Sequence, residues 1–339
     1  MRYMFQDDYS EGCHPAILDA LARGNLAPQA GYGSDAHSEE ARALIRVLVA
    51  NPDAGVHFVS GGTQANLVVI AALLRPHEAV ISAATGHVLG HEAGAIEATG
   101  HKVVAVPGRD GKLAPEDILA ALRAHAQAPH VVKPRLVYIS NATELGTVYR
   151  RDELVALSRC CREHGLYLFV DGARMAAALR SPCSDATPAD FGALVDAFYL
   201  GGTKNGALLG EAIVINDPSL DADFGYAVKQ RGAMLAKGRV LGVQFQALLE
   251  DGLYFRLADH ANAQAAKIAR ALRERGHALH APHETNQLFP ILPRETIDTL
   301  RARFAFHHWE DVDDRRAVVR FVTSWATTDA AVAALVAAL

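Results

Sequence analysis

An alternation of short apolar runs with amphipathic stretches, between about residues 55 and 215, most constrains the fold of this chain. The runs are rich in β-branched residues and most are bounded by turn residues, so they predict strands. The predicted strands are Val56–Val59, Ala79–Ile81, Val103–Val106, Leu136–Ile139, Leu166–Val170, Ala197–Leu200 and Ala212–Ile215. The predicted helices between them are Gln64–Leu74, Glu92–Thr99, Pro115–Ala126 and Arg151–His164. We therefore expect an α/β fold with a mostly parallel sheet covered on both faces.

The pattern changes after Gly252, where one helix is predicted over Leu253–Arg275. Strands follow near Gln287–Leu292 and Ala317–Val322, with further helices after Pro293 and after Thr328. A chain of 339 residues fits a large domain with a smaller one. We predict a large domain over residues 1–250, including an N-terminal arm over 1–50, and a small α+β domain over 251–339 that packs beside the first few dozen residues.

Charge and composition restrict the possible partners. The formal net charge is −5, and no run of basic residues is present, so nucleic acid and anionic membranes are poor candidates. We find no apolar stretch that could span a bilayer and no signal peptide at the start. None of the four cysteines has metal-ligand spacing, and reduced thiols in the cytoplasm are expected.

A glycine-rich turn, Ser60-Gly61-Gly62-Thr63-Gln64-Ala65-Asn66, follows the first predicted strand and opens a helix. Free N–H groups at a helix start bind phosphate, glycines let an anion approach the backbone, and the Thr63 hydroxyl can add a hydrogen bond. Glycine is also frequent in ordinary strand-to-helix turns, so this motif alone leaves both interpretations open.

An acid and a lysine follow two later strands. Asp171 begins Asp171-Gly172-Ala173-Arg174, and Lys204 lies in Gly201-Gly202-Thr203-Lys204-Asn205-Gly206. Ligands bind at the carboxyl ends of parallel strands, although Asp171 could instead cap a helix. Arg174 can fork onto a carboxylate. A lysine between glycines, downstream of an acid and a phosphate loop, is typical of a nucleophile that forms an imine.

These motifs resemble the threonine aldolase family of the β-eliminating lyase group, which are fold-type I pyridoxal-phosphate enzymes. The resemblance runs from Asp8-Tyr9-Ser10-Glu11-Gly12 to Arg320-Phe321-Val322-Thr323. It implies that pyridoxal 5′-phosphate forms a Schiff base with Lys204, that Asp171 pairs with its ring nitrogen, and that Thr203 contacts its phosphate. The family usually has Ser-Lys-Gly where this chain has Thr203-Lys204-Asn205.

The resemblance assigns roles to several further residues. It implies that His87, ahead of Glu92-Ala93-Gly94, stacks on the cofactor ring, with His91 as the competing candidate. Further expected contacts with the cofactor or the substrate come from Gly62, Thr63, Ser10, Arg174 and Arg320, the last of these as the clamp for the substrate carboxylate. Tyr32 resembles a loop residue that reaches the site of a neighbouring subunit, and Arg231 or Lys237 would cross over to the phosphate.

One segment departs from the family. Where members place a histidine that contacts the substrate hydroxyl, this chain has Glu144 within Asn141-Ala142-Thr143-Glu144. Glu144 can replace that histidine as proton acceptor, can be a surface turn residue, or can indicate another substrate. His87 is the alternative acceptor.

The resemblance implies an L-threonine or L-allo-threonine aldolase that forms glycine and an aldehyde, assembled as a homotetramer built from dimers. Two alternatives remain. One is β-elimination or another α-carbon reaction of an amino acid, and the other is a non-catalytic binding protein of the same fold.

Overall fold

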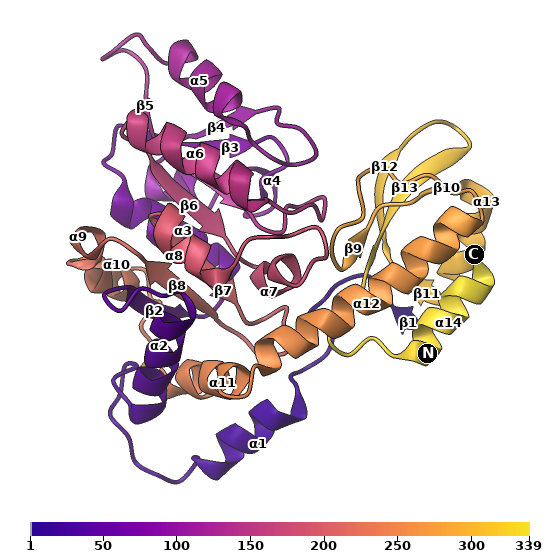
Figure 1. Ribbon diagram of the computed structural model, residues 1–339, viewed down its shortest axis with the longest axis horizontal. Coiled ribbons are helices and arrows are strands. Elements are labelled where there is room, and N and C mark those ends of the chain that lie inside the picture. The colour runs from indigo at the N-terminus through magenta and orange to yellow at the C-terminus, as the bar shows by residue number, and fades with distance from the viewer. Residues whose placement is uncertain (1) are drawn as a thin grey trace.

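A seven-stranded sheet organises the larger part of the molecule in this computed structural model, which describes residues 2–339 (Figure 1). The strand order is β2-β8-β7-β6-β5-β3-β4. The strands are β2 (Gly55–Val59), β3 (Glu78–Ala83), β4 (Val103–Val106), β5 (Lys133–Ser140), β6 (Tyr167–Asp171), β7 (Ala197–Gly201) and β8 (Glu211–Ile215). All predicted strands of this region are present, and the expected mostly parallel α/β sheet is confirmed.

Strand β8 alone runs against its neighbours in this sheet. It pairs antiparallel with both β2 and β7, whereas the remaining pairs are parallel. Two successive reversals leave β2 and β7 running in the same direction. Every strand except β8 therefore ends at one common edge, which is where α/β proteins bind ligands.

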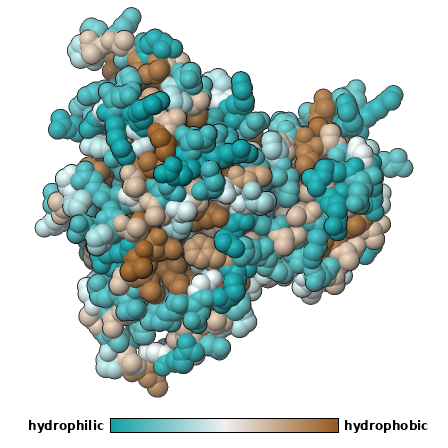
Figure 2. All heavy atoms as spheres, viewed as in Figure 1, coloured by the Kyte–Doolittle hydropathy of each residue, from teal (hydrophilic) through white to brown (hydrophobic). Residues whose placement is uncertain are grey.

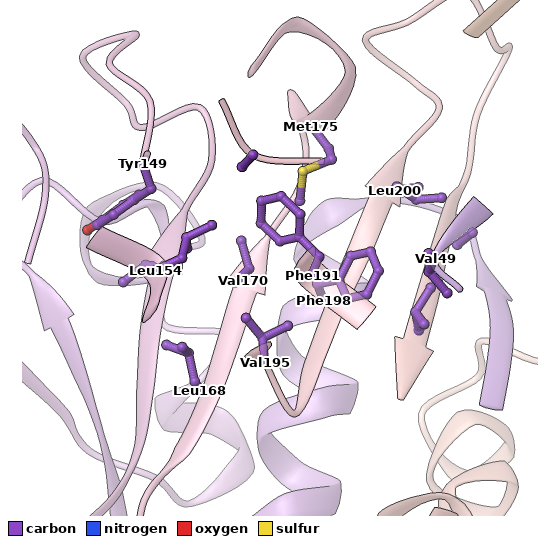
Figure 3. Packing of buried hydrophobic residues seen from close by; sticks show 14 of the residues in the cluster. Val49, Tyr149, Leu154, Leu168, Val170, Met175, Phe191, Val195, Phe198 and Leu200 are labelled. Carbon is purple, nitrogen blue, oxygen red and sulfur yellow. The ribbon is translucent and has the colours of Figure 1, made fainter. Parts of the chain in front are cut away.

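Helices cover both faces of the sheet (Figure 1). Those before β9 are α1 (Pro15–Arg23), α2 (Ala36–Leu48), α3 (Gly62–Leu73), α4 (His87–Gly90), α5 (Pro115–Ala124), α6 (Arg151–Glu163), α7 (Met175–Leu179), α8 (Pro188–Leu194), α9 (Pro218–Asp221), α10 (Phe224–Gln230), α11 (Arg239–Leu249) and α12 (Leu253–Glu274). Alternate side chains of one strand enter two separate cores, because successive strand residues point to opposite faces. Figure 3 shows one core, where Leu168 and Val170 of β6 and Phe198 of β7 pack near Phe191 of α8.

The predicted helix over Glu92–Thr99 is wrong. Helix α4 ends at Gly90, and only a 3-10 turn over Glu97–Thr99 follows. Ala93 and Gly94 between them have φ of 49° and 73°, which is the left-handed region that ends a right-handed helix.

The C-terminal part forms a smaller α+β unit. Its elements are β9 (Gln287–Leu288), β10 (Ile291–Pro293), α13 (Arg294–Arg301), β11 (Phe304–Ala305), β12 (His307–Asp311), β13 (Arg316–Val322) and α14 (Asp329–Ala338). The start of the chain joins this unit, because β1 (Tyr3–Met4) pairs with β11 and Phe5 is buried in its core. Helix α12 contributes to the cores of both units. The division near residue 250 stays a prediction.

The face in Figure 2 is mostly hydrophilic, with its largest hydrophobic group over the large unit and smaller hydrophobic areas on both units. Large apolar side chains that are exposed to solvent include Leu26, Val47 and Tyr226. Within residues 2–339, no helix combines the length and the hydrophobicity that crossing a membrane requires.

Candidate active site

The loops that follow β2, β6 and β7 meet at the common edge of the sheet, and two adjoining hollows lie above them. Both hollows are lined by His87, Glu144, Arg174 and Lys204. The inner hollow also reaches Gly62, Asn66, Asp171 and Tyr199. The outer one is a cavity of about 530 Å³ whose far wall comes from β12 and β13, including Trp309 and Arg320. The three predicted motifs therefore converge on one site.

The start of helix α3 offers unpaired donors to the site. The N-cap residue is Gly61, which has no side chain to accept from the first N–H groups, and the neighbouring Ser60 hydroxyl donates to Gln64 Oε1 at 2.8 Å. A Cβ at Gly62 would lie 3.1 Å from the Tyr199 hydroxyl, so a side chain there would crowd the inner hollow. Exposed N–H groups at a helix start favour an anion.

Asp171 ends β6 and is only 4% exposed. Its Oδ2 accepts from the Tyr138 hydroxyl at 2.6 Å and from Asn66 Nδ2 at 3.0 Å, and Oδ1 accepts from the Ala173 N–H at 2.9 Å. Burial alone would raise the pKa of Asp171, but these hydrogen bonds, chiefly that from Tyr138, hold the pKa below its ordinary value. The site therefore contains a buried carboxylate that stays ionised at neutral pH.

Asp171 belongs to a chain of hydrogen bonds that reaches Glu144. Asn66 Nδ2 also donates to Glu92 Oε1 at 2.7 Å, and Glu92 Oε1 is 2.8 Å from His87 Nδ1. The backbone N–H of His87 donates to Glu144 Oε1 at 2.9 Å. Ser140 Oγ also donates to Glu144 Oε1, at 2.6 Å. Ser140 Oγ lies 3.3 Å from the Tyr138 hydroxyl, but that hydroxyl gives its proton to Asp171, so the two hydroxyls are in polar contact without a shared proton.

His87 and Glu144 both line the cavity. Because Glu92 engages Nδ1 of His87, that nitrogen carries the proton in the neutral ring and Nε2 is left as the acceptor. Burial, with the charge of Asp171 nearby, raises the pKa of Glu144 above its ordinary value, and the Ser140 hydrogen bond offsets this only in part. His91 lies next to His87, with ring centroids 5.6 Å apart, and lines only the outer cavity.

Lys204 lies on the loop after β7, with Nζ 5.9 Å from the centre of the Tyr9 ring. Burial and the positive charge of Arg174 lower the pKa of Lys204. Within residues 2–339, no carboxylate oxygen comes within 4 Å of Nζ. This environment favours the neutral, nucleophilic amine.

Two arginines face the same cavity but differ in their partners. Arg174 makes a fork with buried Asp8, with Nε and Nη2 at 2.7 and 3.1 Å from its oxygens. Arg320 of β13 donates from Nη2 to Gln6 O at 3.2 Å and to Asp7 Oδ1 at 3.3 Å. Its buried Nε has no partner among the described residues. Arg320 therefore retains donors for a ligand, while the Arg174 fork is occupied.

Several predicted residues lie outside the cavity of this chain. Ser10 is exposed, and its hydroxyl bonds only weakly to Asp7 O at 3.5 Å. Thr203 accepts from the Gly210 N–H at 3.0 Å, and Thr63 is exposed at the start of α3. Three more, Tyr32, Arg231 and Lys237, line neither hollow. Tyr32 is 54% exposed, with Lys229 Nζ 4.5 Å from its ring centre, while the Arg231 carbonyl accepts from Gln64 Nε2 at 3.5 Å.

Other residues of the site have no role that the sequence analysis predicts. Asp8, Asn66 and Glu92 lie inside motifs that carry the family resemblance, so their positions are a signal for a role at the site. Tyr138 and Trp309 have no comparable signal, because their partners are distant in the chain. Glu211, which is 3% exposed at the start of β8, directly precedes the predicted strand Ala212–Ile215, and an acid in that position is a further signal.

These residues fit pyridoxal phosphate. The uncapped start of α3 suits the phosphate, buried Asp171 suits a protonated pyridine nitrogen, and Lys204 has the lowered pKa that imine formation needs. His87 borders the hollow that contains both Asp171 and Lys204, as a ring stacked on the cofactor would. Tyr199, whose buried hydroxyl has no partner among residues 2–339, also lines this hollow.

Comparisons with known proteins show the family of this chain. The sequence pattern of the β-eliminating lyase family matches residues 5–293. A low specificity L-threonine aldolase of Pseudomonas aeruginosa is 37% identical over 324 residues, which is 95% of this chain and 92% of that protein. The structure of a Leishmania major threonine aldolase superposes with a TM-score of 0.97 at 49% identity, covering 99% of this chain and 98% of that one.

A more distant comparison concerns the fold alone. Aspartate aminotransferase of Thermus thermophilus has a TM-score of 0.75 at 16% identity and covers 99% of this chain and 90% of its own. With the family match over most of the chain, these findings confirm the resemblance drawn from the motifs. The chain belongs to the β-eliminating lyase family of pyridoxal-phosphate-dependent enzymes and has their fold-type I architecture.

Proposed function

We propose that this chain is an aldolase that splits the Cα–Cβ bond of an L-β-hydroxy-α-amino acid, with threonine and allo-threonine as substrates, into glycine and an aldehyde. The observation that carries the proposal is that two proton acceptors, His87 and Glu144, border the same cavity as Lys204 and Arg320. This cleavage requires removal of the β-hydroxyl proton, a carboxylate clamp and a nucleophilic lysine in one place.

When bound, pyridoxal phosphate supplies an electron-withdrawing ring that stabilises the negative charge left at the substrate α-carbon. Asp171 would hold a proton on the ring nitrogen, because its depressed pKa keeps the carboxylate ionised at neutral pH. Lys204 would hold the cofactor covalently and release it to the substrate amine. Gly62 and Thr63 would bind the phosphate through their backbone N–H groups.

Arg320 would bind the substrate carboxylate. Its guanidinium lines the cavity, and its hydrogen bonds within residues 2–339 come only from Nη2, so donors are left for a carboxylate. The fork of Arg174 is filled by Asp8, so Arg174 would hold the N-terminal segment in place and add positive charge to the cavity.

The β-hydroxyl proton would pass to Glu144 or to His87. A carboxylate whose pKa is raised toward neutrality is a stronger base than an ordinary glutamate, and Glu144 has this property. His87 offers Nε2 because Nδ1 is held by Glu92. The hydrogen bond between the His87 N–H and Glu144 places the two candidates side by side.

The family resemblance also supports a homotetramer built from dimers and a cytoplasmic location. Exposed apolar residues at Leu26, Tyr32 and Val47 are compatible with an interface formed by the N-terminal arm. Tyr32, Arg231 and Lys237 would then complete the site of a neighbouring subunit. Size-exclusion chromatography with light scattering tests the assembly, and a monomer would contradict it.

The proposed activity is tested with purified protein whose visible absorption has been recorded. Incubation with L-threonine and L-allo-threonine should yield acetaldehyde and glycine in equal amounts, and Lys204→Ala should abolish both products. The unusual Glu144 favours one second candidate, β-elimination. From these substrates, 2-oxobutanoate and ammonia in place of glycine and acetaldehyde would establish that reaction and refute the aldolase.

A further inference from the structure

Glu211 is a buried acid that the proposed reaction does not use. It is the first residue of β8, and the ladders place it opposite Val59 at the end of β2 and opposite Gly201 at the end of β7. The phosphate loop follows the first of these residues and the lysine loop follows the second. Glu211 therefore lies between the two loops, at the edge of the sheet that carries the site.

Its carboxylate is held toward the lysine loop. Glu211 Oε2 accepts from the Gly202 N–H at 3.0 Å, two residues before Lys204. Phe245 and Leu241 close this region from α11, since a Cβ at Gly202 would lie 3.1 Å from Phe245 and one at Gly210 would lie 2.7 Å from Leu241. Within residues 2–339, Glu211 forms no ion pair with an N···O distance of 4 Å or less.

We propose that Glu211 is a positioning residue for Lys204, a buried carboxyl group beneath the lysine loop whose charge sets the proton affinity of the Lys204 nitrogen. The two groups are not in direct contact, so Glu211 acts through its charge and no proton passes directly between them. The inference rests on the role that the proposed function gives to Lys204.

The electrostatics of the pair agree with this geometry. Burial raises the pKa of Glu211 to about 8, even though the Thr203 hydroxyl, the positive charge of Lys204 and the Gly202 N–H all act to lower it. A charged Glu211 in turn raises the pKa of Lys204, against the lowering by burial and by Arg174. Other titratable groups also face the pair from neighbouring segments. They are Asp8 and Tyr9 of the N-terminal segment, Asp171 of β6, Tyr199 of β7 and Tyr254 of α12.

This control would serve both stages of a turnover. Lys204 must be neutral when it attacks the cofactor, and a protonated, neutral Glu211 adds no charge that would hold a proton on the amine. When the substrate amine displaces Lys204, an ionised Glu211 favours the protonated form of the lysine. A charge buried alone would be costly in this apolar region, so an ionised Glu211 and a protonated Lys204 stabilise each other.

The test is a pH titration of the visible absorption of the holoenzyme, which reports the protonation of the Lys204 nitrogen directly. The wild-type curve should require two ionisations, because the charge of Glu211 changes the proton affinity of that nitrogen. Glu211→Gln keeps an oxygen for the Gly202 N–H but cannot ionise. Its curve should fit a single ionisation with the midpoint at lower pH, because no carboxylate then stabilises the protonated nitrogen.

Two further variants separate this role from a structural one. Glu78→Gln changes another buried glutamate, which accepts from the Arg75 N–H at 2.9 Å at the opposite edge of the sheet, and should titrate like wild type. Glu211→Asp keeps the charge and should retain two ionisations. If Glu211→Gln does not fold, the wild-type and Glu211→Asp curves decide the question.

A Glu211→Gln curve that superimposes on wild type, or moves to higher pH, overturns the proposal, as does a wild-type curve with one ionisation. Aldehyde release from threonine by the wild-type enzyme is measured separately. If the wild type cleaves threonine while the curves coincide, the inference about Glu211 fails and the aldolase stands.

Discussion

Two arginine–aspartate forks in this protein have the same geometry and differ mainly in burial. Arg174 binds Asp8 through Nε at 2.7 Å and Nη2 at 3.1 Å. Arg180 binds Asp259 through the same atoms at 2.7 and 3.1 Å. The side chains of the first pair are 12% and 1% exposed, and those of the second are 48% and 44% exposed. We predict that Asp8→Asn destabilises the protein far more than Asp259→Asn.

The expected magnitudes follow from the solvent around each pair. Removing one partner of a buried ion pair destabilises by about 3–5 kcal/mol, because the other charge stays buried without compensation. Arg174 borders the water-accessible cavity, so we expect the lower end, about 3 kcal/mol. For Asp259→Asn we expect about 0–1 kcal/mol, as in other exposed pairs. The Asn286 amide, 2.9 Å from Asp8 Oδ2, keeps an acceptor in the asparagine variant and should not add to the loss.

Urea denaturation of both variants, without added cofactor, measures the two free energies of unfolding. The pH dependence gives an independent check, because the ion pair and hydrogen bonds with Arg174 outweigh burial and hold the pKa of Asp8 below 3.8. The stabilisation that ionised Asp8 provides is full above the pKa of Asp8 in the unfolded state. It is lost as the pH falls through the pKa of Asp8 in the folded state. The difference between wild type and Asp8→Asn should therefore be full at pH 7 and shrink below pH 3.8. Equal losses for the two variants at pH 7 would refute the reasoning.

Three further predictions concern the site and its support. Glu144→Gln should lower kcat about 10²- to 10⁴-fold. The rate of the wild type should fall as the pH drops through the raised pKa of Glu144, and the variant should lack this pH dependence. An unchanged pH–rate profile would assign the proton to His87. Arg320→Lys should raise KM roughly 30-fold, equivalent to about 2 kcal/mol of lost charge-assisted hydrogen bonding, and an unchanged KM would remove Arg320 from the carboxylate site. Gly172→Ala should abolish soluble expression, because its Cβ would lie 1.7 Å from the backbone oxygen of Tyr199. The control Gly225→Ala, whose Cβ would have nothing within 4 Å, should fold and gain up to about 1 kcal/mol of stability. Similar stability of these two variants would contradict the packing argument.

The parts of the fold that local sequence determines were predictable. Each strand of the large sheet is a short apolar run, and burial on both faces makes such runs stand out. Gly62, Asp171 and Lys204 follow strands whose ends share one edge, so the order of motifs along the chain was enough to place them together. The helix expected over Glu92–Thr99 failed because two left-handed residues break a segment whose composition favours helix.

The support of the site could not be predicted in this way. Asp8 meets Arg174 from 166 positions away, and Asn66 meets Asp171 from 105 positions away. Nothing in the local sequence of either member indicates its partner. The same holds for β12, whose histidines and Trp309 form the far wall of the cavity but follow no clear alternation of apolar and polar residues.

The antiparallel position of β8 has a consequence for the synthesis of this protein. The strand before the phosphate loop, Gly55–Val59, has one neighbour in the sheet, and that neighbour is Glu211–Ile215. During translation β2 must therefore wait until residue 215 has left the ribosome before it can join the sheet. Until then the nascent chain has no ordered place for the phosphate, even though Asp171 and its strand have already emerged. We therefore expect each new chain to bind the cofactor only late in its synthesis. A polypeptide truncated anywhere before β8 should not bind the cofactor.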